Sequence, residues 1–315
     1  MTIPSEMAVP ILSFLDDISP RDSKWVKYKI SSFAIADIYS TIEIFHSYAD
    51  RINDCSSSLH FVVDIDFNLR LISARFCRVR YCVVCQWRRS MMWKAKAIQS
   101  LSNIVADFPK CRFLFLTLTV RNCDITNLRE TLKYMNQSFV RLFSRKRFSI
   151  VMGSLRSTEV TMSEEFDDEG VPYAHPHFHC LLMVKASYFS GSYYLTADDW
   201  SSCWQKALKS PYKPVIYVTA ISQKVNPKFI IPELLKYSTK PSDLAKNSTW
   251  LIELTKQTHK MRFVATAGVF KKYMSDLDED PDDLIGKAED DDSFEIKSEF
   301  VFDWDSHYRK YKLTL

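Results

Sequence analysis

Glycine is scarce in this chain, with only five glycines among 315 residues, and no glycine-rich loop that could cradle a phosphate is present. We also find no internal repeat, no nucleophile elbow and no motif of paired carboxylates. Long apolar runs are missing as well. The first apolar stretch, Ala8 to Leu15, contains Pro10 and stops at Asp16, so it is too short for a signal peptide or a membrane helix. We therefore expect a folded, cytoplasmic protein without a membrane partner.

The composition is sufficient for a sizeable core, because 46% of the residues are hydrophobic and 14% are aromatic. The length of 315 residues suggests one large domain or two modest ones. In a reducing compartment the eight cysteines are not expected to form a disulfide framework. Metal binding is then the leading interpretation of any cysteines that cluster.

The charge is distributed unevenly along the chain, although the formal total is only +4. Residues 275–315 contain 14 acidic and five basic residues, so residues 1–274 carry a net charge of +13. A body this basic suits a polyanion, since Lys and Arg side chains release counterions when they neutralise phosphates. The alternative on charge alone is a surface that serves solubility.

Hydrophobic periodicity predicts an α+β protein in which helices pack on an antiparallel sheet. Helices are expected over residues 22–54, 86–108, 127–148, 229–237 and 250–259. Strands are expected over residues 59–74, as a hairpin turning near Asn68, and over 111–120, 154–162 and 176–184. Residues 276–292 are acidic and predict a solvated linker, with a final hairpin formed by residues 295–302 and 308–313.

The sharpest local signal is the sequence His175-Pro176-His177-Phe178-His179, which leads into an apolar run. Residues two apart share one face of a strand, so His177 and His179 present both imidazoles in the same direction while Phe178 enters the core. Two neighbouring imidazoles are costly to desolvate unless a ligand uses them. We expect them to form half of a metal site; the alternative is a structural role. The role of His175 stays open between support of that site and simple strand entry.

The third metal ligand is expected from the neighbouring strand, where Glu159 stands between Thr158 and Val160. Two imidazoles and one carboxylate with open positions suit a hard divalent ion, Mg²⁺ or Mn²⁺, acting on a phosphate as a Lewis acid. The alternative is that Glu159 is a surface residue.

A second constellation lies in the segment from Glu233 to Lys240. On a helix, Glu233 and Tyr237 are four residues apart, and Lys240 continues the same face. A tyrosine with a pKa near 10 becomes a useful nucleophile only beside a polarised phosphate, a cation or a base. By itself this spacing is common on the exposed surface of helices. It indicates a catalytic site only in combination with the other motifs.

The third constellation is a cysteine cluster formed by Cys77, Cys82 and Cys85, with Cys55 upstream. The two-residue gap between Cys82 and Cys85 is typical of zinc knuckles, and thiolates select zinc in tetrahedral sites. Cys55 is the expected fourth ligand, with His60 in reserve. The remaining cysteines are interpreted as small buried hydrophobes: Cys111, Cys123, Cys180 and Cys203.

Basic residues surround the cysteine cluster, which predicts a DNA-binding surface stabilised by zinc. The candidates for DNA contact are Arg78, Arg80, Arg88 and Arg89, with Arg75 nearby.

Together and in this order, these elements resemble the plasmid rolling-circle replication initiators, the Rep class of the HUH endonucleases. The resemblance covers most of the chain. It is carried by the cysteine-rich stretch from Phe76 to Ser90, by Phe115 to Thr119, by His175 to Leu182 and by the Tyr237 segment up to Asp243. The chain departs from the family at Val83, where a proline usually stands between the cysteines.

The resemblance implies a ferredoxin-like antiparallel sheet with flanking helices, in which His177 and His179 bind the metal ion and Tyr237 attacks the scissile phosphate. Cleavage would leave a 5′-phosphotyrosyl bond and a free 3′-hydroxyl. Similarity to single-tyrosine initiators implies that Glu233 activates water to end the cycle and that Lys240 stabilises phosphate charge. The implied partners are plasmid origin DNA, single-stranded or in a hairpin at the nick site, and the host helicase, polymerase and single-strand binding protein.

The expected organisation has four parts. Residues 1–108 form a helical, cysteine-rich zinc and DNA-binding region, 109–273 the HUH nuclease domain, 274–293 an acidic linker and 294–315 a terminal hairpin. Two alternatives remain. A relaxase or transposase of the HUH type would use the same histidines and tyrosine on another DNA. A non-catalytic zinc-containing regulator would need only the cysteines. A zinc hydrolase is less well supported, because no third ligand stands at helical spacing from the histidines.

Overall fold

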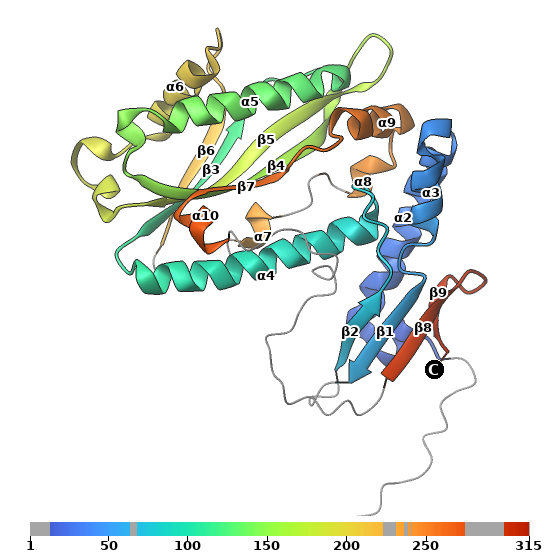
Figure 1. Ribbon diagram of the computed structural model, residues 1–315. Helices are drawn as coiled ribbons and strands as arrows, with labels where there is room; N and C mark the ends of the chain where they lie inside the picture. The colour runs from blue at the N-terminus through green and yellow to red at the C-terminus, as the bar shows by residue number, and fades with distance from the viewer. Residues whose placement is uncertain are drawn as a thin grey trace, which may run out of the picture. The chain divides into compact units, whose positions relative to one another are not determined.

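The computed structural model describes residues 13–63, 68–222, 231–235, 239, 241–274 and 299–314. The chain divides into two compact units (Figure 1). We call residues 1–89 with 279–315 the cysteine unit, and residues 90–278 the histidine unit. The division falls inside the long helix α4 (Val83–Asp107), whose first turns belong to the cysteine unit, whereas the sequence suggests a boundary at its end.

The prediction of an α+β protein with antiparallel sheets and flanking helices is confirmed. The histidine unit contains a five-stranded sheet in the order β6-β3-β5-β4-β7. All four neighbouring pairs are antiparallel. Its strands are β3 (Arg112–Thr119), β4 (Val151–Phe166), β5 (Pro172–Val184), β6 (Ile216–Ile221) and β7 (Val264–Gly268). The strand that carries the histidine motif, β5, therefore lies at the centre.

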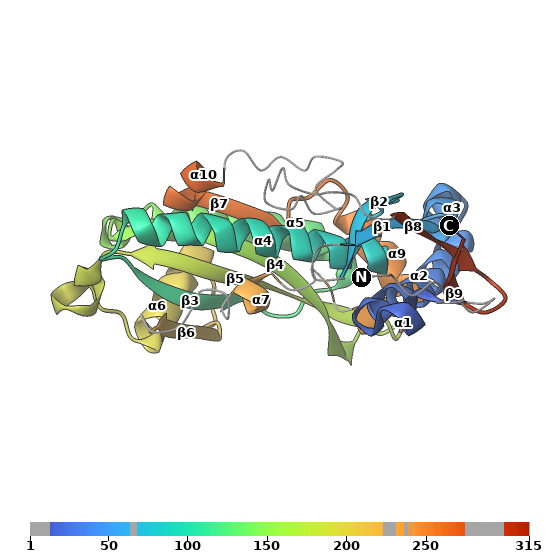
Figure 2. The same ribbon diagram turned by 90° about the horizontal axis from the view of Figure 1, so that it is seen from below.

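Helices cover both faces of this sheet (Figures 1 and 2). On one face lie α5 (Leu128–Phe143) and α6 (Ala197–Leu208), where Phe139 of α5 packs on Phe178 of β5. On the other face α4, α7 (Ile231–Leu234) and α10 (Val269–Tyr273) form an apolar cluster with Leu155 and Leu181 of the sheet. Both faces of β5 are thus largely buried, which accounts for its nearly continuous apolar sequence after His179.

Two of the rare glycines lie where β4 and β7 approach most closely. Gly153 pairs with Gly268, and a Cβ atom on Gly153 would come within 2.8 Å of the Ala267 carbonyl oxygen. Gly268 has a φ of +57°, a conformation that favours glycine. These two positions allow the backbone of β7 to pass directly against β4 before α10 begins.

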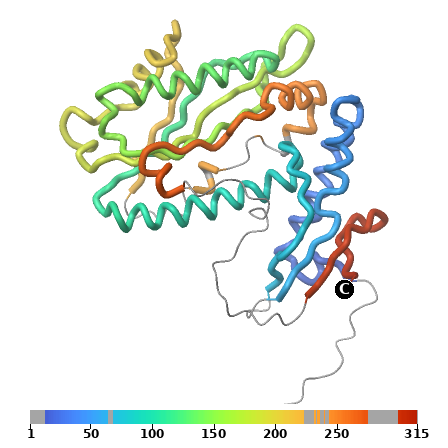
Figure 3. Tube along the Cα trace, in the orientation of Figure 1, coloured from blue at the N-terminus to red at the C-terminus, as the bar shows by residue number. Residues whose placement is uncertain are grey.

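The cysteine unit contains a four-stranded sheet in the order β2-β1-β8-β9. The predicted hairpin is confirmed as β1 (Ser58–Val63) and β2 (Leu69–Ala74), and the predicted terminal hairpin as β8 (Glu299–Asp305) and β9 (Lys310–Leu313). The terminal hairpin is not separate, because β8 pairs with β1 and extends the N-terminal sheet (Figure 3). The helices of this unit include α1 (Leu15–Ile18), α2 (Lys24–Ser40) and α3 (His46–Asn53).

A buried tyrosine joins the terminal hairpin to the segment beside Cys55. The hydroxyl of Tyr311 donates a hydrogen bond to the Ser56 carbonyl oxygen at 2.8 Å and lies 3.0 Å from the Ser56 hydroxyl. Ser56 has a φ of +53°, so the backbone turns sharply just after Cys55. Burial raises the pKa of Tyr311 well above its ordinary value, so the hydroxyl stays a neutral donor.

Replacement of Tyr311 by Phe should destabilise the cysteine unit by about 1–3 kcal/mol, because the buried Ser56 carbonyl loses its donor while the ring remains. Urea unfolding followed by circular dichroism measures this change. The control is Tyr308→Phe, which removes a hydroxyl from a half-exposed ring of the same hairpin. Equal stability of the two variants would contradict the proposed anchoring.

The predicted helices and strands mostly occur, and β4 and β5 are longer than expected. The predicted 22–54 helix is divided into α2 and α3, and α9 (Ser248–Gln257) confirms the one predicted over 250–259. The elements that had not been predicted include α1, α6, α8 (Pro241–Leu244), α10, β6 and β7. The capping box of Thr196 and Asp199 at the start of α6 is a signal that could have revealed that helix. In the described residues no helix is long and apolar enough to cross a membrane.

Candidate functional site

The histidine motif lies on the central strand of the five-stranded sheet. Along β5 the side chains alternate, so His175, His177 and His179 share the face that α4, α7 and α10 partly cover, while Phe178 is fully buried on the opposite face. The rings of His177 and His179 are 4.8 Å apart between centroids. The sheet therefore presents two adjacent imidazoles on one side.

Glu159 completes a compact group with these two histidines. It lies on β4 directly opposite His177, and its Oε2 atom is 3.0 Å from Nε2 of His177 and 2.9 Å from Nε2 of His179. One oxygen thus faces two ring nitrogens. Together these ligand atoms lie within 4.8 Å of one another, so the group could hold a metal ion.

Neighbouring polar groups fix the orientation of both imidazoles. The Nδ1–H of His177 donates to the His175 carbonyl oxygen at 3.2 Å, and Nδ1 of His179 lies 3.2 Å from the Thr117 hydroxyl. With Nδ1 occupied in this way, each Nε2 atom points to Glu159. This is the arrangement that metal-binding histidines usually have, with one nitrogen for the ion and the other held by the protein.

His175 lies beside this group but outside it. Its Nδ1–H donates to the Asn122 side-chain oxygen at 2.7 Å, and its ring centroid is 5.3 Å from that of His177. Burial, followed by the positive charge of His177, lowers the pKa of His175. His175 thus supports His177 through its carbonyl and its ring.

The ionisation of Glu159 suits a group that could bind a cation. Burial opposes the charge of Glu159, but hydrogen bonds and charge interactions with His177 and His179 outweigh it and hold the pKa of that carboxyl well below its usual range. Two imidazole nitrogens and one carboxylate oxygen are donors that divalent ions accept.

Helix α7 is tied to the sheet next to this group. The Ser157 hydroxyl donates to the Leu234 carbonyl oxygen at 2.5 Å, and Ser157 lies directly opposite His179 in the sheet. The Ser90 hydroxyl of α4 donates to the next carbonyl, that of Leu235, at 2.8 Å. Of the predicted catalytic residues, Glu233 lies in α7 but its side chain is outside the described part of the structure, and Tyr237 and Lys240 are outside the described residues.

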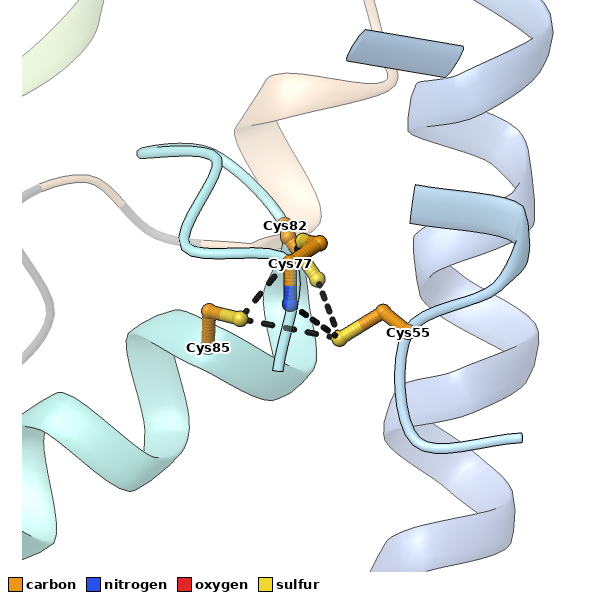
Figure 4. A group of neighbouring side chains, drawn as sticks. All are labelled: Cys55, Cys77, Cys82 and Cys85. Atoms are coloured by element: carbon orange, nitrogen blue, oxygen red, sulfur yellow. Dashed lines mark hydrogen bonds between the residues drawn. The ribbon is translucent and has the colours of Figure 1, made fainter. Parts of the chain in front are cut away.

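The four predicted cysteines meet in the cysteine unit, although they come from separate segments (Figure 4). Sγ of Cys55 lies 3.6 Å from that of Cys85 and 3.7 Å from that of Cys82, and Cys77 and Cys85 are also 3.6 Å apart. All four are buried, and their sulfur atoms lie within 4.8 Å of one another. The reserve candidate His60 instead pairs with Glu299 at 3.0 Å, away from the sulfur atoms.

The donor set and its spacing fit a tetrahedral zinc ion. Four sulfur atoms about 2.3 Å from zinc are about 3.8 Å apart, close to the separations found here. Backbone amides also point at the sulfurs: Cys77 N–H donates to Sγ of Cys55 at 3.4 Å, and Arg78 N–H to Sγ of Cys85 at 3.3 Å. Arg78 adopts a φ of +58°, which directs its amide to the sulfur. Hydrogen bonds to thiolates stabilise their negative charge.

Helix α2 contributes two polar side chains that the sequence did not single out. The ammonium of Lys29 is fully buried, with Nζ 2.8 Å from the Asn53 carbonyl oxygen and 2.5 Å from that of Cys55. Burial lowers the pKa of Lys29, while the nearby cysteines raise it. Three residues further along α2, the Ser32 hydroxyl lies 3.6 Å from Sγ of Cys82. A buried cation beside four thiolates would offset part of their negative charge.

The predicted DNA-binding arginines have different environments. Arg78 is exposed, whereas Arg80, Arg88 and Arg89 are half-buried. The guanidinium of Arg88 lies 5.5 and 5.4 Å from the ring centroids of Trp25 and Trp87, and burial lowers its pKa to about 10. Of the cysteines interpreted as buried hydrophobes, Cys111 and Cys180 are buried, and Cys123 and Cys203 are partly exposed.

Comparisons with known proteins agree with the geometry. The family described as Replication protein matches residues 68–312. A "Protein rep" of Streptococcus pneumoniae serotype 2 is 32% identical over 299 residues, which is 92% of each chain. A "Protein rep" of Lentilactobacillus hilgardii is 32% identical over 94% of this chain and 98% of its own. One from Bacillus amyloliquefaciens is 29% identical over 89% and 91%. No solved structure matches the chain.

Proposed function

The chain belongs to the family of plasmid replication initiator (Rep) proteins, and on that premise we propose that it starts rolling-circle replication by nicking and rejoining origin DNA through Tyr237. The observation that carries this proposal is the group of Glu159, His177 and His179 on adjacent central strands, beside the helix that leads to Tyr237. Among the alternatives, the family match favours a replication protein over a relaxase or transposase.

The ligands of the catalytic ion would be Glu159, His177 and His179, in a ferredoxin-like sheet of the HUH type. A bound Mg²⁺ or Mn²⁺ would polarise the scissile phosphate as a Lewis acid. The protein's part is to hold three ligand atoms on rigid strands, with Thr117 and the His175 carbonyl fixing the imidazole orientations. Rigid placement matters because a site of this kind works through preorganised charge.

We expect Tyr237 to lie near this group. It follows Leu234 by three residues, and three residues span at most about 11 Å. The Leu234 carbonyl is hydrogen-bonded to Ser157, the direct neighbour of His179 in the sheet. The short connection from Leu234 would therefore keep the Tyr237 side chain near a phosphate bound at the metal site.

In the proposed reaction the Tyr237 oxygen attacks the scissile phosphorus, and the bond to the 3′ oxygen breaks. The phenol loses its proton, the departing 3′ oxygen gains one, and the 5′ phosphate remains esterified to tyrosine. Attack by a 3′-hydroxyl on this ester reverses the process and rejoins the strand. Lys240 would stabilise the phosphate charge, and Glu233 would take a proton from the water that ends the cycle. The free 3′-hydroxyl would serve the host polymerase, with helicase and single-strand binding protein acting on the displaced strand in the cytoplasm.

The cysteine cluster would hold a structural zinc ion, with Cys55, Cys77, Cys82 and Cys85 as ligands. Zinc at this position would join α3, the segment before α4 and the first turn of α4 into one unit. The exposed Arg78 and the neighbouring Arg80, Arg88 and Arg89 would then form a basic surface for origin DNA, as in other small zinc-stabilised DNA-binding regions.

The polarity of the covalent product tests this proposal. Single-stranded origin oligonucleotides labelled at either end are incubated with the protein and Mn²⁺, then separated on denaturing gels. We expect only the 3′-labelled fragment to become attached to protein, while the 5′-labelled fragment is released with an end that a polymerase extends. Attachment of the 5′-labelled fragment, or cleavage without any attached DNA on a verified origin, would overturn the proposed chemistry.

A further inference from the structure

The face of the sheet that carries the metal-site residues continues onto the edge strand β6. In the antiparallel register Tyr217 of β6 lies opposite Thr117 of β3, which in turn lies opposite His179 of β5. Directly opposed residues in a sheet share one face, so Tyr217 and His179 lie on the same side. Two strand spacings of about 4.8 Å separate them by about 10 Å.

The outer part of this face is open to solvent, in contrast to its centre. Tyr217 is 66% exposed, whereas Thr117 is 9% exposed. Thr219, the next residue of β6 on this side, is also exposed. A large aromatic ring on an exposed edge position buries little surface within the protein. Here it stands at the margin of the metal group, where a bound polymer would leave the site.

An arginine stands at the end of β3, near the other end of this strip. The exposed Arg121 has its guanidinium carbon 4.1 Å from the ring centroid of Tyr212, and its backbone N–H donates to the Tyr212 hydroxyl at 3.0 Å. Arg121 comes two residues after Thr119, and Thr119 lies opposite His177. Stacking on Tyr212 holds the charge of Arg121 in place at an exposed position.

The net charge of the histidine unit suits the binding of a polyanion. Residues 90–278 contain 26 basic and 16 acidic residues, a net charge of +10. Aromatic rings that stack bases, combined with cations that bind phosphates, are the features by which proteins hold single strands.

We propose that the β6 edge is a binding strip for single-stranded DNA, in which Tyr217 stacks on a base and Arg121 contacts a phosphate next to the metal group. This inference rests on the proposed function, because it assigns residues that would hold the unpaired strand beside that site. Stacking is tolerant of sequence, so the strip would hold the DNA strand beside the scissile phosphate without selecting the origin sequence. Origin selection would then come from other parts of the protein.

Binding of a fluorescent oligodeoxythymidylate without added Mg²⁺ or Mn²⁺, followed by anisotropy at several salt concentrations, tests the proposal. We expect Tyr217→Ala to weaken binding at least about fivefold with an unchanged salt dependence, and Tyr217→Phe to bind like the wild type. Arg121→Gln should weaken binding and reduce the slope of log affinity against log salt by about one. Tyr134→Ala removes a partly exposed aromatic side chain from α5, on the opposite face, and should have no effect.

The strip is refuted if Tyr217→Ala binds as tightly as the wild type, or if Tyr217→Phe is as weak as the alanine variant, since stacking needs only the ring. Circular dichroism and thermal unfolding confirm that each variant is folded. Covalent adduct formation on origin DNA separates this inference from the proposed function. If the wild type forms adducts and Tyr217→Ala binds DNA normally, the binding strip is wrong but the proposed function stands. If the wild type neither binds DNA nor forms adducts, both the proposed function and the binding strip are wrong.

Discussion

Glu159→Gln is expected to reduce metal-dependent nicking at least about 100-fold. Glutamine keeps the size of the side chain but removes the charge from the oxygen that faces both His177 and His179. Loss of an outer partner of a metal ligand already costs about 10- to 100-fold in affinity or activity, and loss of a ligand should cost more. Nicking rates over a range of Mn²⁺ concentrations measure the effect, and high Mn²⁺ should restore part of the activity.

The matched control is Glu164→Gln, which makes the same chemical change at an exposed position of the same strand. It should nick DNA at the wild-type rate at every Mn²⁺ concentration. If Glu159→Gln also nicks at the wild-type rate in limiting Mn²⁺, Glu159 is not a ligand, and its hydrogen bonds to the histidines are structural only.

Zinc removal is expected to unfold the cysteine unit. A structural zinc site contributes about 10–16 kcal/mol of apparent binding free energy, comparable with the whole stability of a typical domain. Cys82→Ser, or a strong chelator acting on the wild type, should therefore make residues 13–89 sensitive to protease. The histidine unit has a separate apolar core around Leu155 and Leu181 and should stay resistant.

Cys203→Ser is the control, because Cys203 lies in α6 of the histidine unit, outside the cysteine cluster. Purified wild type and Cys203→Ser should each contain one zinc ion per chain by atomic absorption, and Cys82→Ser none. Wild-type protein that is folded, fully reduced and free of zinc would contradict this interpretation of the cluster.

Much of the candidate site follows from local sequence rules. His177 and His179 could be assigned to one face because a strand alternates with a period of two, and Glu159 because a short acidic loop predicts antiparallel pairing of its two strands. The short spacing of Cys77, Cys82 and Cys85 also predicted their cluster, because cysteines close in sequence lie close together in a zinc knuckle. Cys55 was found because it precedes a hairpin that ends beside the cluster.

The remaining features depend on contacts between distant parts of the chain. The hydrogen bond from Ser157 to Leu234 joins residues 77 positions apart, and that from Tyr311 to Ser56 joins residues 255 positions apart. No local pattern reports such pairs. Strand β7, with the sequence VATAG, is only five residues long and three of them are alanine or glycine, so its local signal is weak, whereas its pairing with β4 at Gly153 is a contact between distant residues. Lys29 was overlooked because a lysine within a helix is usually exposed.

The most direct test of the account is covalent adduct formation by the wild type and Tyr237→Phe on single-stranded origin DNA, each in Mn²⁺ or EDTA, with mass spectrometry of the adduct peptide. We predict a DNA-linked peptide at Tyr237 only for the wild type in Mn²⁺, and no adduct in the other three reactions. Phenylalanine keeps the ring and removes the attacking oxygen, so folding and DNA binding should be unchanged. An adduct of equal yield in Tyr237→Phe, or one attached to another residue, would contradict the assignment of Tyr237 as the nucleophile.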